Sequence, residues 1–331
     1  MVTGGAGFIG SNFIRYILNK YPSYSVLNYD KLTYAGNLEN LTDVEERDKY
    51  KFIKGDIIDT NLVSKLAKEV EVIINFAAES HVDRSIEDPF AFIETDVRGT
   101  YSLIQAARDA GHERFIQIST DEVYGDQEGK EKVKEDAPLE PSSPYSASKA
   151  GGDLQVLSAH RTYGFPGIVT RCTNNYGPYQ FPEKLVPLFI TNLLQNKPLP
   201  VYGDGRQIRD WLYVDDHCSA IDVVLHKGKS GEIYNIAAEQ NPEVTNLDLT
   251  KRLLNSMGKD DSMLQYIKDR PGHDRRYAVD SSKIRDMGWK PSLTFEEGLE
   301  KTINWYKENR NWWEKIKSGE YKEWYKQQYG G

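Results

Sequence analysis

The chain has 331 residues, long enough for a large hydrophobic core and, at the usual domain size, for two domains. Its formal net charge of -8 argues against a general affinity for nucleic acid or for an anionic membrane surface. Cys172 and Cys218 form no Cys-x-x-Cys pair and the histidines form no His-Glu-x-x-His motif, so we expect neither a disulfide framework nor a metal site. Because the sequence shows no apolar leader and no run of about 18 apolar residues, we expect a cytoplasmic protein with no membrane partner.

The first residues predict a strand, a glycine-rich turn and a helix. Residues 2–3 precede the turn Gly4-Gly-Ala-Gly-Phe-Ile-Gly10, and apolar residues recur at helical spacing over 12–18. A second predicted strand, 25–29, ends at Asp30. The turn fits the dinucleotide fingerprint Gly-x-Gly-x-x-Gly, and Asp30 lies twenty residues beyond its last glycine, where a carboxylate binds a ribose 2'-hydroxyl and repels a 2'-phosphate. We therefore predict NAD rather than NADP as the cofactor.

The first predicted strand is unusually short. Only residues 1–3 precede the glycine turn, whereas a buried strand usually has about five or six residues. Either the chain starts late, or this strand is short and the sheet is less secure there. The sequence leaves both interpretations open.

Strands and helices alternate along the first half of the chain, which predicts a doubly wound (Rossmann) parallel sheet of the α/β class. The further predicted strands are 51–54, 72–76, 115–119 and 167–171, and the predicted helices between them are 61–69, 90–110 and 145–163. In such sheets, ligand sites lie at the carboxyl ends of strands. The stretches that follow strands here are Asp30, Asp56-Ile57, Ala77-Ala-Glu-Ser80 and Thr120-Asp-Glu122.

The second half of the chain changes character. Prolines and glycines punctuate residues 174–209, which indicates long functional loops around one helix, 183–195. The segment 211–237 is typical of a return to the sheet, and helical patterns recur at 247–257 and 295–309. Four tryptophans near the C-terminus are expected to pack against the body or a neighbouring subunit: Trp305, Trp312, Trp313 and Trp324.

These patterns predict two domains. The first is an NAD-binding Rossmann domain of residues 1–171 plus about 211–238. The second is a smaller C-terminal α/β substrate domain of about 172–210 and 239–331.

Several cationic side chains stand in the loops of this acidic protein. Solvated surface charge is the ordinary interpretation of each one. A diphosphate held between two domains needs several of them, because arginine binds phosphate oxygens in a bidentate way. The residues concerned are Lys184, Arg209, Arg270, His273, Arg275 and Arg276.

Tyr145 and Lys149 are four positions apart on a predicted helix, so both side chains lie on one face. An adjacent ammonium favours ionisation of a phenol that must lose its proton near neutral pH. Lowering the pKa of a tyrosine from ~10 to ~7 needs roughly 4 kcal/mol, which this ammonium and a positively charged nicotinamide can supply together in a water-poor pocket. The pair indicates a redox step at a hydroxyl group.

Asp121 and Glu122 are adjacent carboxyl groups at the end of a predicted strand. Loss of water beside a carbonyl needs a base for the carbon-bound proton and an acid for the departing hydroxyl. Environments that separate the two pKa values would assign these roles. A strand-end cap at 119–122 and an ordinary amphipathic turn at 145–149 are the plain structural alternative.

Sequence stretches distributed over almost the whole chain carry a family resemblance. They are residues 3–11, 30–37, 77–85, 119–125, 142–149, 171–178, 181–185, 209–213 and 269–277. Together they resemble the extended short-chain dehydrogenase/reductase superfamily and, within it, the dTDP-glucose 4,6-dehydratase family. The glycine turn and the Tyr145–Lys149 pair occur across the superfamily, whereas Thr120-Asp-Glu122 and the last stretch are far more selective. The chain departs from the family pattern at its short first strand and at Thr173, where serine is common.

The resemblance implies an NAD-dependent lyase that removes water from dTDP-glucose and yields dTDP-4-keto-6-deoxyglucose, for the biosynthesis of rhamnose or another deoxysugar. It implies that Tyr145, assisted by Lys149, takes the proton of the 4-hydroxyl group while hydride leaves C4 for NAD. Thr120 hydrogen-bonds that oxygen. Glu122 then removes the C5 proton, and Asp121 protonates the departing C6 hydroxyl. The hydride returns to C6 and C5 is reprotonated, so NAD is not consumed and is expected to stay bound.

The resemblance also implies the binding residues. With the fingerprint glycines, the cofactor contacts are Gly4, Gly7, Phe8, Ile9, Gly10, Asp30, Lys31, Thr33, Asp56, Ile57, Ala77, Ala78, Thr95, Tyr145, Lys149 and Asn175. The nucleotide-sugar contacts are Ser80, Thr120, Asn174, Glu183, Lys184, Leu185, Pro200, Tyr202, Arg209, Asn246, Arg270, His273 and Tyr277. Family members are commonly homodimers through two helices per subunit, which correspond here to 90–110 and 145–163.

Two other functions share parts of this pattern. A nucleotide-sugar 4-epimerase or decarboxylase uses the glycine turn and Tyr145 with Lys149 but does not need the acid–base pair. A non-catalytic NAD-sensing or scaffold protein can have the same fold, because fold alone does not determine function. Such a protein should have lost its catalytic groups, and those groups are all present here.

Overall fold

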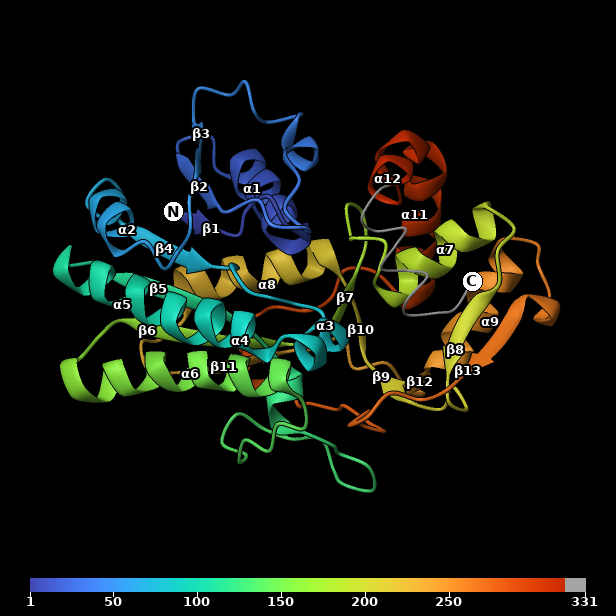
Figure 1. Cartoon of the computed structure of the whole chain (residues 1–331). Coiled ribbons are helices and arrows are strands. Elements are labelled where there is room, and N and C mark those ends of the chain that lie inside the picture. Colours follow the sequence, from blue (N-terminus) through green and yellow to red (C-terminus); the bar gives the residue numbers. More distant parts are fainter. Residues whose placement is uncertain (319–331) are drawn as a thin grey trace.

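The computed structural model describes residues 1–318, and a seven-stranded parallel sheet forms its larger part (Figure 1). The strand order is β11-β6-β5-β4-β1-β2-β3. The strands are β1 (Val2–Thr3), β2 (Val26–Asp30), β3 (Tyr50–Lys54), β4 (Val72–Asn75), β5 (Arg114–Thr120), β6 (Gly167–Cys172) and β11 (Ile233–Ile236). Every neighbouring pair is parallel. The predicted doubly wound sheet is confirmed, and the segment 211–237 returns to it through α8 (Val214–Lys227) and β11, whereas residues 211–213 pair outside it.

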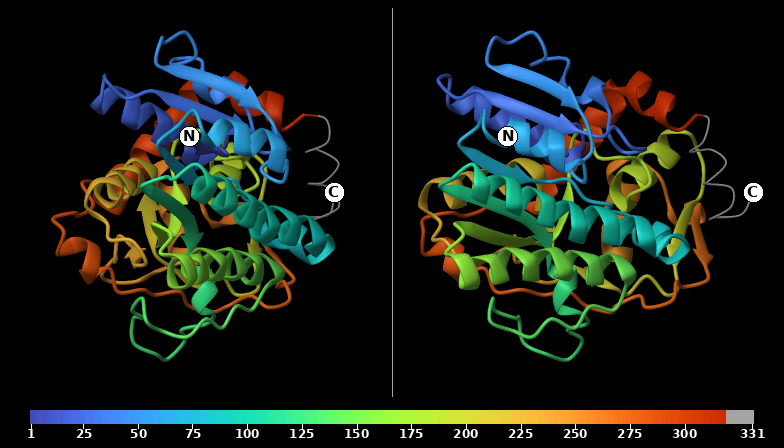
Figure 2. Two further views of the ribbon diagram at one scale, coloured as in Figure 1. Left: turned by 90° about the vertical axis from the view of Figure 1, so that its left-hand side faces the viewer. Right: turned by 60° about the vertical axis from the view of Figure 1, so that its left-hand side comes forward.

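Helices cover both faces of this sheet, because successive strand residues point to opposite faces. On β5, Phe115 belongs to the hydrophobic core on one face, and Ile116 belongs to the core on the other. The first face carries α2 (Thr60–Ala67), α5 (Thr100–Asp109) and α6 (Pro144–Tyr163), and the second carries α1 (Phe8–Lys20) and α8 (Val214–Lys227). Figure 2 shows α5 and α6 side by side. Two cores therefore fix the positions of the strand ends.

Strand β1 is only two residues long, but it lies in the middle of the sheet. It pairs with β2 and β4, and backbone hydrogen bonds continue from Gly4 N to Tyr29 O at 3.0 Å and from Ile74 N to Met1 O at 2.9 Å. Neighbours on both sides thus compensate for its length. The glycine turn that follows is fixed against the end of β4.

The predicted helix 90–110 is not uniform. It consists of α4 (Pro89–Phe92), a π-helical turn η2 (Ile93–Gly99) and α5. Such turns are frequent at functional sites because they change the direction of the side chains that they carry. Here the turn carries Asp96, whose Oδ2 accepts a hydrogen bond from Ser148 Oγ at 2.6 Å.

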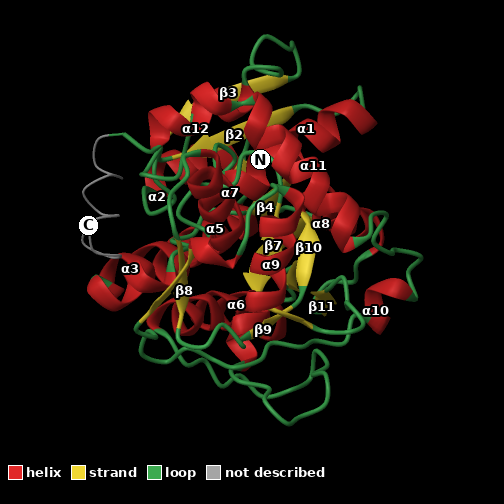
Figure 3. Ribbon diagram, turned by 90° about the vertical axis from the view of Figure 1, so that its right-hand side faces the viewer, coloured by secondary structure: helices red, strands yellow, loops and turns green. Residues whose placement is uncertain are grey.

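A second group of short strands and helices lies beside the sheet, on the right in Figure 1. Its strands form three pairs: β7 (Asn174–Tyr176) with β10 (Trp211–Tyr213), β9 (Ile208–Arg209) with β12 (Val244–Thr245), and β8 (Leu199–Tyr202) with β13 (Leu264–Ile267). Its helices are α7 (Leu185–Leu194), α9 (Asn246–Ser256), α11 (Phe295–Glu308) and α12 (Arg310–Ile316), and loops join these elements (Figure 3). Trp312 and Trp313 are buried in its core and Trp305 packs against it, while Trp324 lies outside the described residues.

Short elements complete the described chain, namely α3 (Val82–Glu87), α10 (Ser282–Arg285) and the single turns η1 (Leu38–Leu41), η3 (Asp121–Tyr124) and η4 (Asp261–Met263). Two predicted helix starts were wrong. Helix α1 begins inside the glycine turn at Phe8 rather than at residue 12, and α7 begins at Leu185 because Lys184 is still extended. Over residues 1–318, every helix is too short or too polar to cross a membrane.

Candidate active site

A cavity of about 290 Å³ lies at the carboxyl ends of β1, β2, β4 and β5, where the sequence predicted a ligand site. All the predicted cofactor residues line it: Gly4, Gly7, Phe8, Ile9, Gly10, Asp30, Lys31, Thr33, Asp56, Ile57, Ala77, Ala78, Thr95, Tyr145, Lys149 and Asn175. The structure therefore brings together residues that are up to 171 positions apart in the chain. Their role in binding a cofactor stays a prediction.

The backbone of the glycine turn packs so closely against neighbouring backbone that Gly4 and Gly10 cannot carry side chains. A Cβ atom on Gly4 would lie 2.6 Å from Ala77 N, and one on Gly10 would lie 2.4 Å from Gly4 O. Gly4 also has a φ of +65°, in the region that favours glycine. Gly7 caps α1 without a side-chain hydrogen bond, so N–H groups at the start of this helix face the cavity and suit a pyrophosphate.

Asp30 is held at the end of β2 by two backbone hydrogen bonds. Its Oδ2 accepts from Ala6 N at 2.9 Å and its Oδ1 accepts from Leu32 N at 2.7 Å. Burial raises the pKa of Asp30, and these two bonds oppose that rise. A carboxylate fixed beside a glycine turn matches the ribose of a dinucleotide without a 2'-phosphate. The residues present therefore fit NAD.

Tyr145 lies in the first turn of α6. The helix starts there because Pro144 follows the cap Ser143, which forms a capping box with Ser146. Lys149 Nζ, one turn on, donates to Ile118 O at 2.7 Å, and both side chains line the first cavity.

The surroundings of Tyr145 do not by themselves make its phenol acidic. Burial, followed by the charges of Glu122 and Asp96, raises the pKa of Tyr145 well above its ordinary value, and a hydrogen bond with Thr120 opposes this. This result differs from the expected lowering by Lys149, because burial and the two neighbouring carboxylates act in the opposite direction on the pKa of the phenol.

Thr120, Asp121 and Glu122 form the end of β5 and the start of η3. Thr120 caps this turn, since its Oγ1 accepts from Glu122 N at 3.2 Å and donates to Asp121 Oδ1 at 3.3 Å. The strand-end cap that was the structural alternative for residues 119–122 is therefore present. It also presents all three side chains to the first cavity.

The two carboxyl groups have different electrostatic surroundings. Burial, followed by the charge of Glu122, raises the pKa of Asp121 well above its usual range. Burial also raises the pKa of Glu122, but Arg270, Arg209 and Lys184 oppose that rise. The surroundings thus oppose ionisation of Asp121 more than ionisation of Glu122, and a difference of this sign matches an acid beside a base.

A second cavity, of about 160 Å³, adjoins the first, because Glu122, Asn174 and Lys184 line both. Thr120 lines the first cavity, and the other predicted nucleotide-sugar residues line the second: Ser80, Asn174, Glu183, Lys184, Leu185, Pro200, Tyr202, Arg209, Asn246, Arg270, His273 and Tyr277. Lys184 Nζ donates to the carbonyl of Ser80 and so joins the two halves of the site.

Two of the six loop cations do not line either cavity. Arg275 pairs with Asp204 at 2.9 Å, and Arg276 pairs with Glu243 at 2.5 Å while donating to backbone carbonyls of residues 127 and 130. For these two the interpretation as surface and structural charge holds. Lys184, Arg209, Arg270 and His273 line the second cavity instead.

Sequence reasoning missed two carboxyl groups that line the site, Asp83 and Glu79, and a third, Asp96, that is hydrogen-bonded to Glu79 N. Asp83 lines the second cavity, accepts from Tyr202 Oη at 3.2 Å and pairs with Arg270 at 3.5 Å. Glu79 lines the first cavity, and burial raises its pKa to about 7. Both belong to the stretch 77–85, which carries the family resemblance, so the sequence could have indicated these two acids as site residues. Asp96 carried no such signal, because its position depends on the π turn.

A doubly wound sheet with a glycine turn after β1, an acid after β2 and a Tyr–Lys pair on α6 defines an NAD-dependent short-chain dehydrogenase/reductase of the extended type. A protein family described as GDP-mannose 4,6 dehydratase matches residues 1–302. The chain is 48% identical to the dTDP-glucose 4,6-dehydratase of Salmonella typhimurium, over 100% of this chain and 99% of that one. The chain belongs to the dTDP-glucose 4,6-dehydratase family.

Solved structures agree with this membership. A dTDP-glucose 4,6-dehydratase from Streptomyces venezuelae, crystallised with NAD and TYD, superposes with a TM-score of 0.93 at 51% identity and covers 95% of this chain and 98% of its own. A UDP-glucuronic acid 4-epimerase from Bacillus cereus, in complex with UDP-glucuronic acid and NAD, gives a TM-score of 0.87 at 30% identity and covers 93% and 98%.

Proposed function

We propose that the chain catalyses the NAD-dependent dehydration of dTDP-glucose to dTDP-4-keto-6-deoxyglucose, a hydro-lyase step in the biosynthesis of rhamnose or another deoxysugar. The observation that carries this proposal is the pair Asp121 and Glu122, adjacent carboxyl groups in unlike surroundings, where the two cavities meet. A 4-epimerase or a decarboxylase has no need of that pair.

NAD, when bound, supplies the acceptor for the C4 hydride, the donor that returns it to C6, and a positively charged ring. The chain's part is to hold the dinucleotide by the glycine turn at 4–10 and by Asp30. The anchors of Asp30 are two backbone N–H groups, so this contact does not depend on flexible side chains.

Three proton transfers fall to residues around the junction of the cavities. Tyr145 takes the proton of the 4-hydroxyl group, with Thr120 hydrogen-bonded to it and to the substrate oxygen. The 4-keto group then acidifies the C5 proton, which the ionised Glu122 removes. Asp121, kept protonated by burial and by the neighbouring Glu122 charge, gives its proton to the departing C6 hydroxyl. When the hydride returns to C6, C5 takes up a proton again, and the 4-keto-6-deoxy product is complete.

The second cavity supplies the positive charge that a diphosphate requires. Arg209, Arg270 and Lys184 line it within an acidic protein, and the guanidinium groups suit bidentate contact with phosphate oxygens. Lys184 donates a hydrogen bond to Ser80 O, which follows the sheet. This contact links the residues that would bind the diphosphate to those that would surround the reacting sugar ring.

Incubation of the purified protein with dTDP-glucose tests this function. We expect an alkali-induced chromophore of the 4-keto sugar, and its absence would refute the dehydratase assignment. Comparison of turnover with dTDP-, UDP- and GDP-hexoses tests the choice of nucleotide, for which we expect dTDP-glucose to react fastest.

We also propose a cytoplasmic homodimer. Large apolar side chains on α4, η2, α5 and α6 are exposed, which is unusual for a monomer surface. They are Phe90 (67%), Ile93 (50%), Tyr101 (50%), Leu154 (55%) and Tyr163 (59%). Light scattering should give twice the chain mass, and an aspartate in place of Leu154 should return it to the monomer mass. The predicted division into a Rossmann domain and a nucleotide-sugar-binding domain is part of the same proposal.

A further inference from the structure

The turn of residues 237–240, which follows β11, has a rarely adopted backbone conformation. Glu239 has a φ of +59°, in the left-handed region that residues with a Cβ seldom occupy. Such a conformation persists only where surrounding contacts enforce it, and it is a reason to ask what the turn does.

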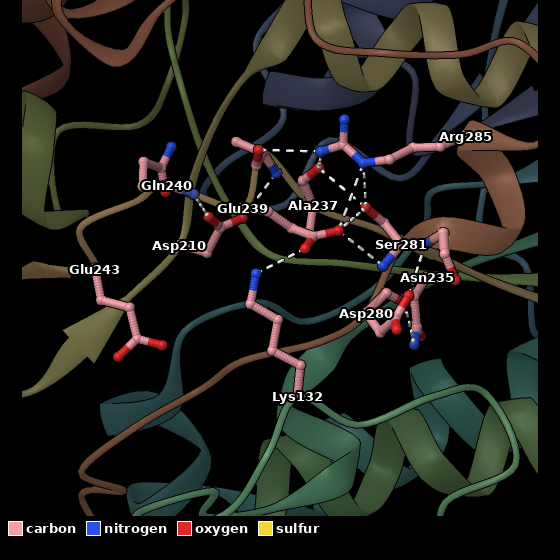
Figure 4. A network of polar contacts seen from close by, with 12 residues as sticks. Lys132, Asp210, Asn235, Ala237, Glu239, Gln240, Glu243, Asp280, Ser281 and Arg285 are labelled. Atoms are coloured by element: carbon pink, nitrogen blue, oxygen red, sulfur yellow. Dashed lines mark hydrogen bonds and ion pairs between the residues drawn. The ribbon is translucent and has the colours of Figure 1, made fainter.

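The side chain of Glu239 supplies those contacts (Figure 4). Its carboxylate accepts from Lys132 Nζ at 2.6 Å, from Ser281 N at 3.0 Å and from Ser281 Oγ at 2.5 Å. Arg285 donates to the carbonyl of Ala238 at 3.1 Å. Burial by itself raises the pKa of Glu239, but the bonds from Lys132 and Ser281 outweigh it and hold the pKa at about 2.

The two neighbours of Glu239 are bound to the residues that follow Arg209. Asp210 accepts from Ala238 N at 2.8 Å and from Gln240 N at 3.0 Å. The amide of Gln240 accepts from Trp211 N at 2.8 Å and donates to Trp211 O at 2.6 Å. Four hydrogen bonds therefore fasten the turn to residues 210 and 211.

Arg209 is one of the cationic side chains that line the second cavity. It is 5% exposed, its guanidinium lies 4.1 Å from the ring centre of Tyr277, and it donates to Asp274 O at 2.9 Å. Its charge opposes the rise in the pKa of both Asp121 and Glu122. Arg209 and Glu239 also line one small cavity of about 20 Å³.

We propose that Glu239 is a positioning residue for Arg209. By fixing the turn 237–240, it clamps residues 210 and 211 and sets where the Arg209 guanidinium meets the diphosphate of the substrate. This inference rests on the proposed function. Residues that fix the side chains of a binding site in this way commonly affect binding without touching the ligand.

The test is Glu239→Gln in the full-length protein, with Glu232→Gln as its matched control. Glu232 also pairs with a lysine, Lys283, at 2.6 Å, and it lines neither of the two site cavities. We expect Glu239→Gln to raise KM for dTDP-glucose about tenfold, which corresponds to about 1.4 kcal/mol, with kcat within about twofold. Glu232→Gln should leave both constants unchanged.

A double-mutant cycle shows whether the effect passes through Arg209. In an Arg209→Lys background, Glu239→Gln should change KM by less than about twofold, because the interaction it supports is already lost. An unchanged KM in the single variant, or an equal rise in both backgrounds, would overturn the inference. If Glu239→Gln does not fold, Gln240→Ala takes its place, because it removes only the two side-chain hydrogen bonds to Trp211. We expect the same rise in KM for this variant. A wild-type protein without dehydratase activity would instead overturn the proposed function.

Discussion

The first cavity lies at the ends of strands of a sheet that is packed between two hydrophobic cores. The second cavity lies among paired strands of two to four residues and the loops between them. Thr120 and Tyr145 are placed by the sheet and by the first turn of a long helix. Arg209, at the end of the two-residue strand β9, is held by a hydrogen bond to Asp274 O, and Arg270 is held by an ion pair with Asp83 of α3. We infer that the half built on the seven-stranded sheet performs the chemistry and the half built on short strands and loops binds the nucleotide sugar.

This comparison predicts two kinds of kinetic defect. Changes at the first cavity should lower kcat, because they remove groups that act in the transition state. Changes at the second cavity should raise KM, because its groups bind substrate and transition state alike.

Tyr145→Phe should have the largest effect. Loss of the proton acceptor for the 4-hydroxyl group is expected to lower kcat about 1,000-fold, within the range for general acid–base catalysis, with little change in KM. The control is Tyr266→Phe, because Tyr266 is an exposed tyrosine on β13 that lines neither cavity. Steady-state kinetics with dTDP-glucose measures both variants, and a Tyr145→Phe enzyme that keeps a tenth of its activity would contradict this assignment.

Arg270→Gln should act on the other half. Removing a buried guanidinium that lines the second cavity is expected to raise KM about 30-fold, equivalent to about 2 kcal/mol, while kcat changes little. Arg275→Gln is the control, because Arg275 pairs with Asp204 and lines neither cavity. A loss confined to kcat would show that the second cavity takes part in the chemistry.

The pH dependence of elimination should show a smaller and graded effect. Glu122 has to be ionised, and burial raises its pKa, so the rate should fall as the pH drops through a value above the ordinary ~4.3 of glutamate. Asp121 has to be protonated, and its pKa lies well above its usual range, so the rate should fall again as the pH rises through that value. Rapid-mixing measurements of water loss between these limits test the signs. An acid limb at or below ~4 would contradict the environment assigned to Glu122.

The extent to which the sequence predicted the molecule follows the same division. The strands of the sheet, the glycine turn and Asp30 were predicted because apolar periodicity and the dinucleotide fingerprint report local structure. The other cofactor-side residues were predicted from the family resemblance. The π turn that carries Asp96 left no periodic signal. The sequence also could not show whether Arg275 and Arg276 bind substrate or form ion pairs, because only the fold brings Asp204 and Glu243 next to them.

Electrostatic surroundings were the least predictable property. The sequence placed a lysine one helical turn from Tyr145, but the pKa of this tyrosine is raised by burial and by two carboxylates, Glu122 and Asp96, that lie on other segments of the chain. The acid and base roles of Asp121 and Glu122 likewise depend on Arg209, Arg270 and Lys184, which are distant in the chain.

A single-turnover experiment with Glu122→Gln tests the central claim most directly, because it separates oxidation at C4 from loss of water. Mixed with dTDP-glucose, this variant should develop the absorbance band of NADH at a rate close to that of the wild type, and the band should then persist because the C5 proton is not removed. Formation of the 4-keto-6-deoxy product should slow at least about 100-fold. Equal slowing of both signals would contradict the assignment of Glu122 to the elimination step.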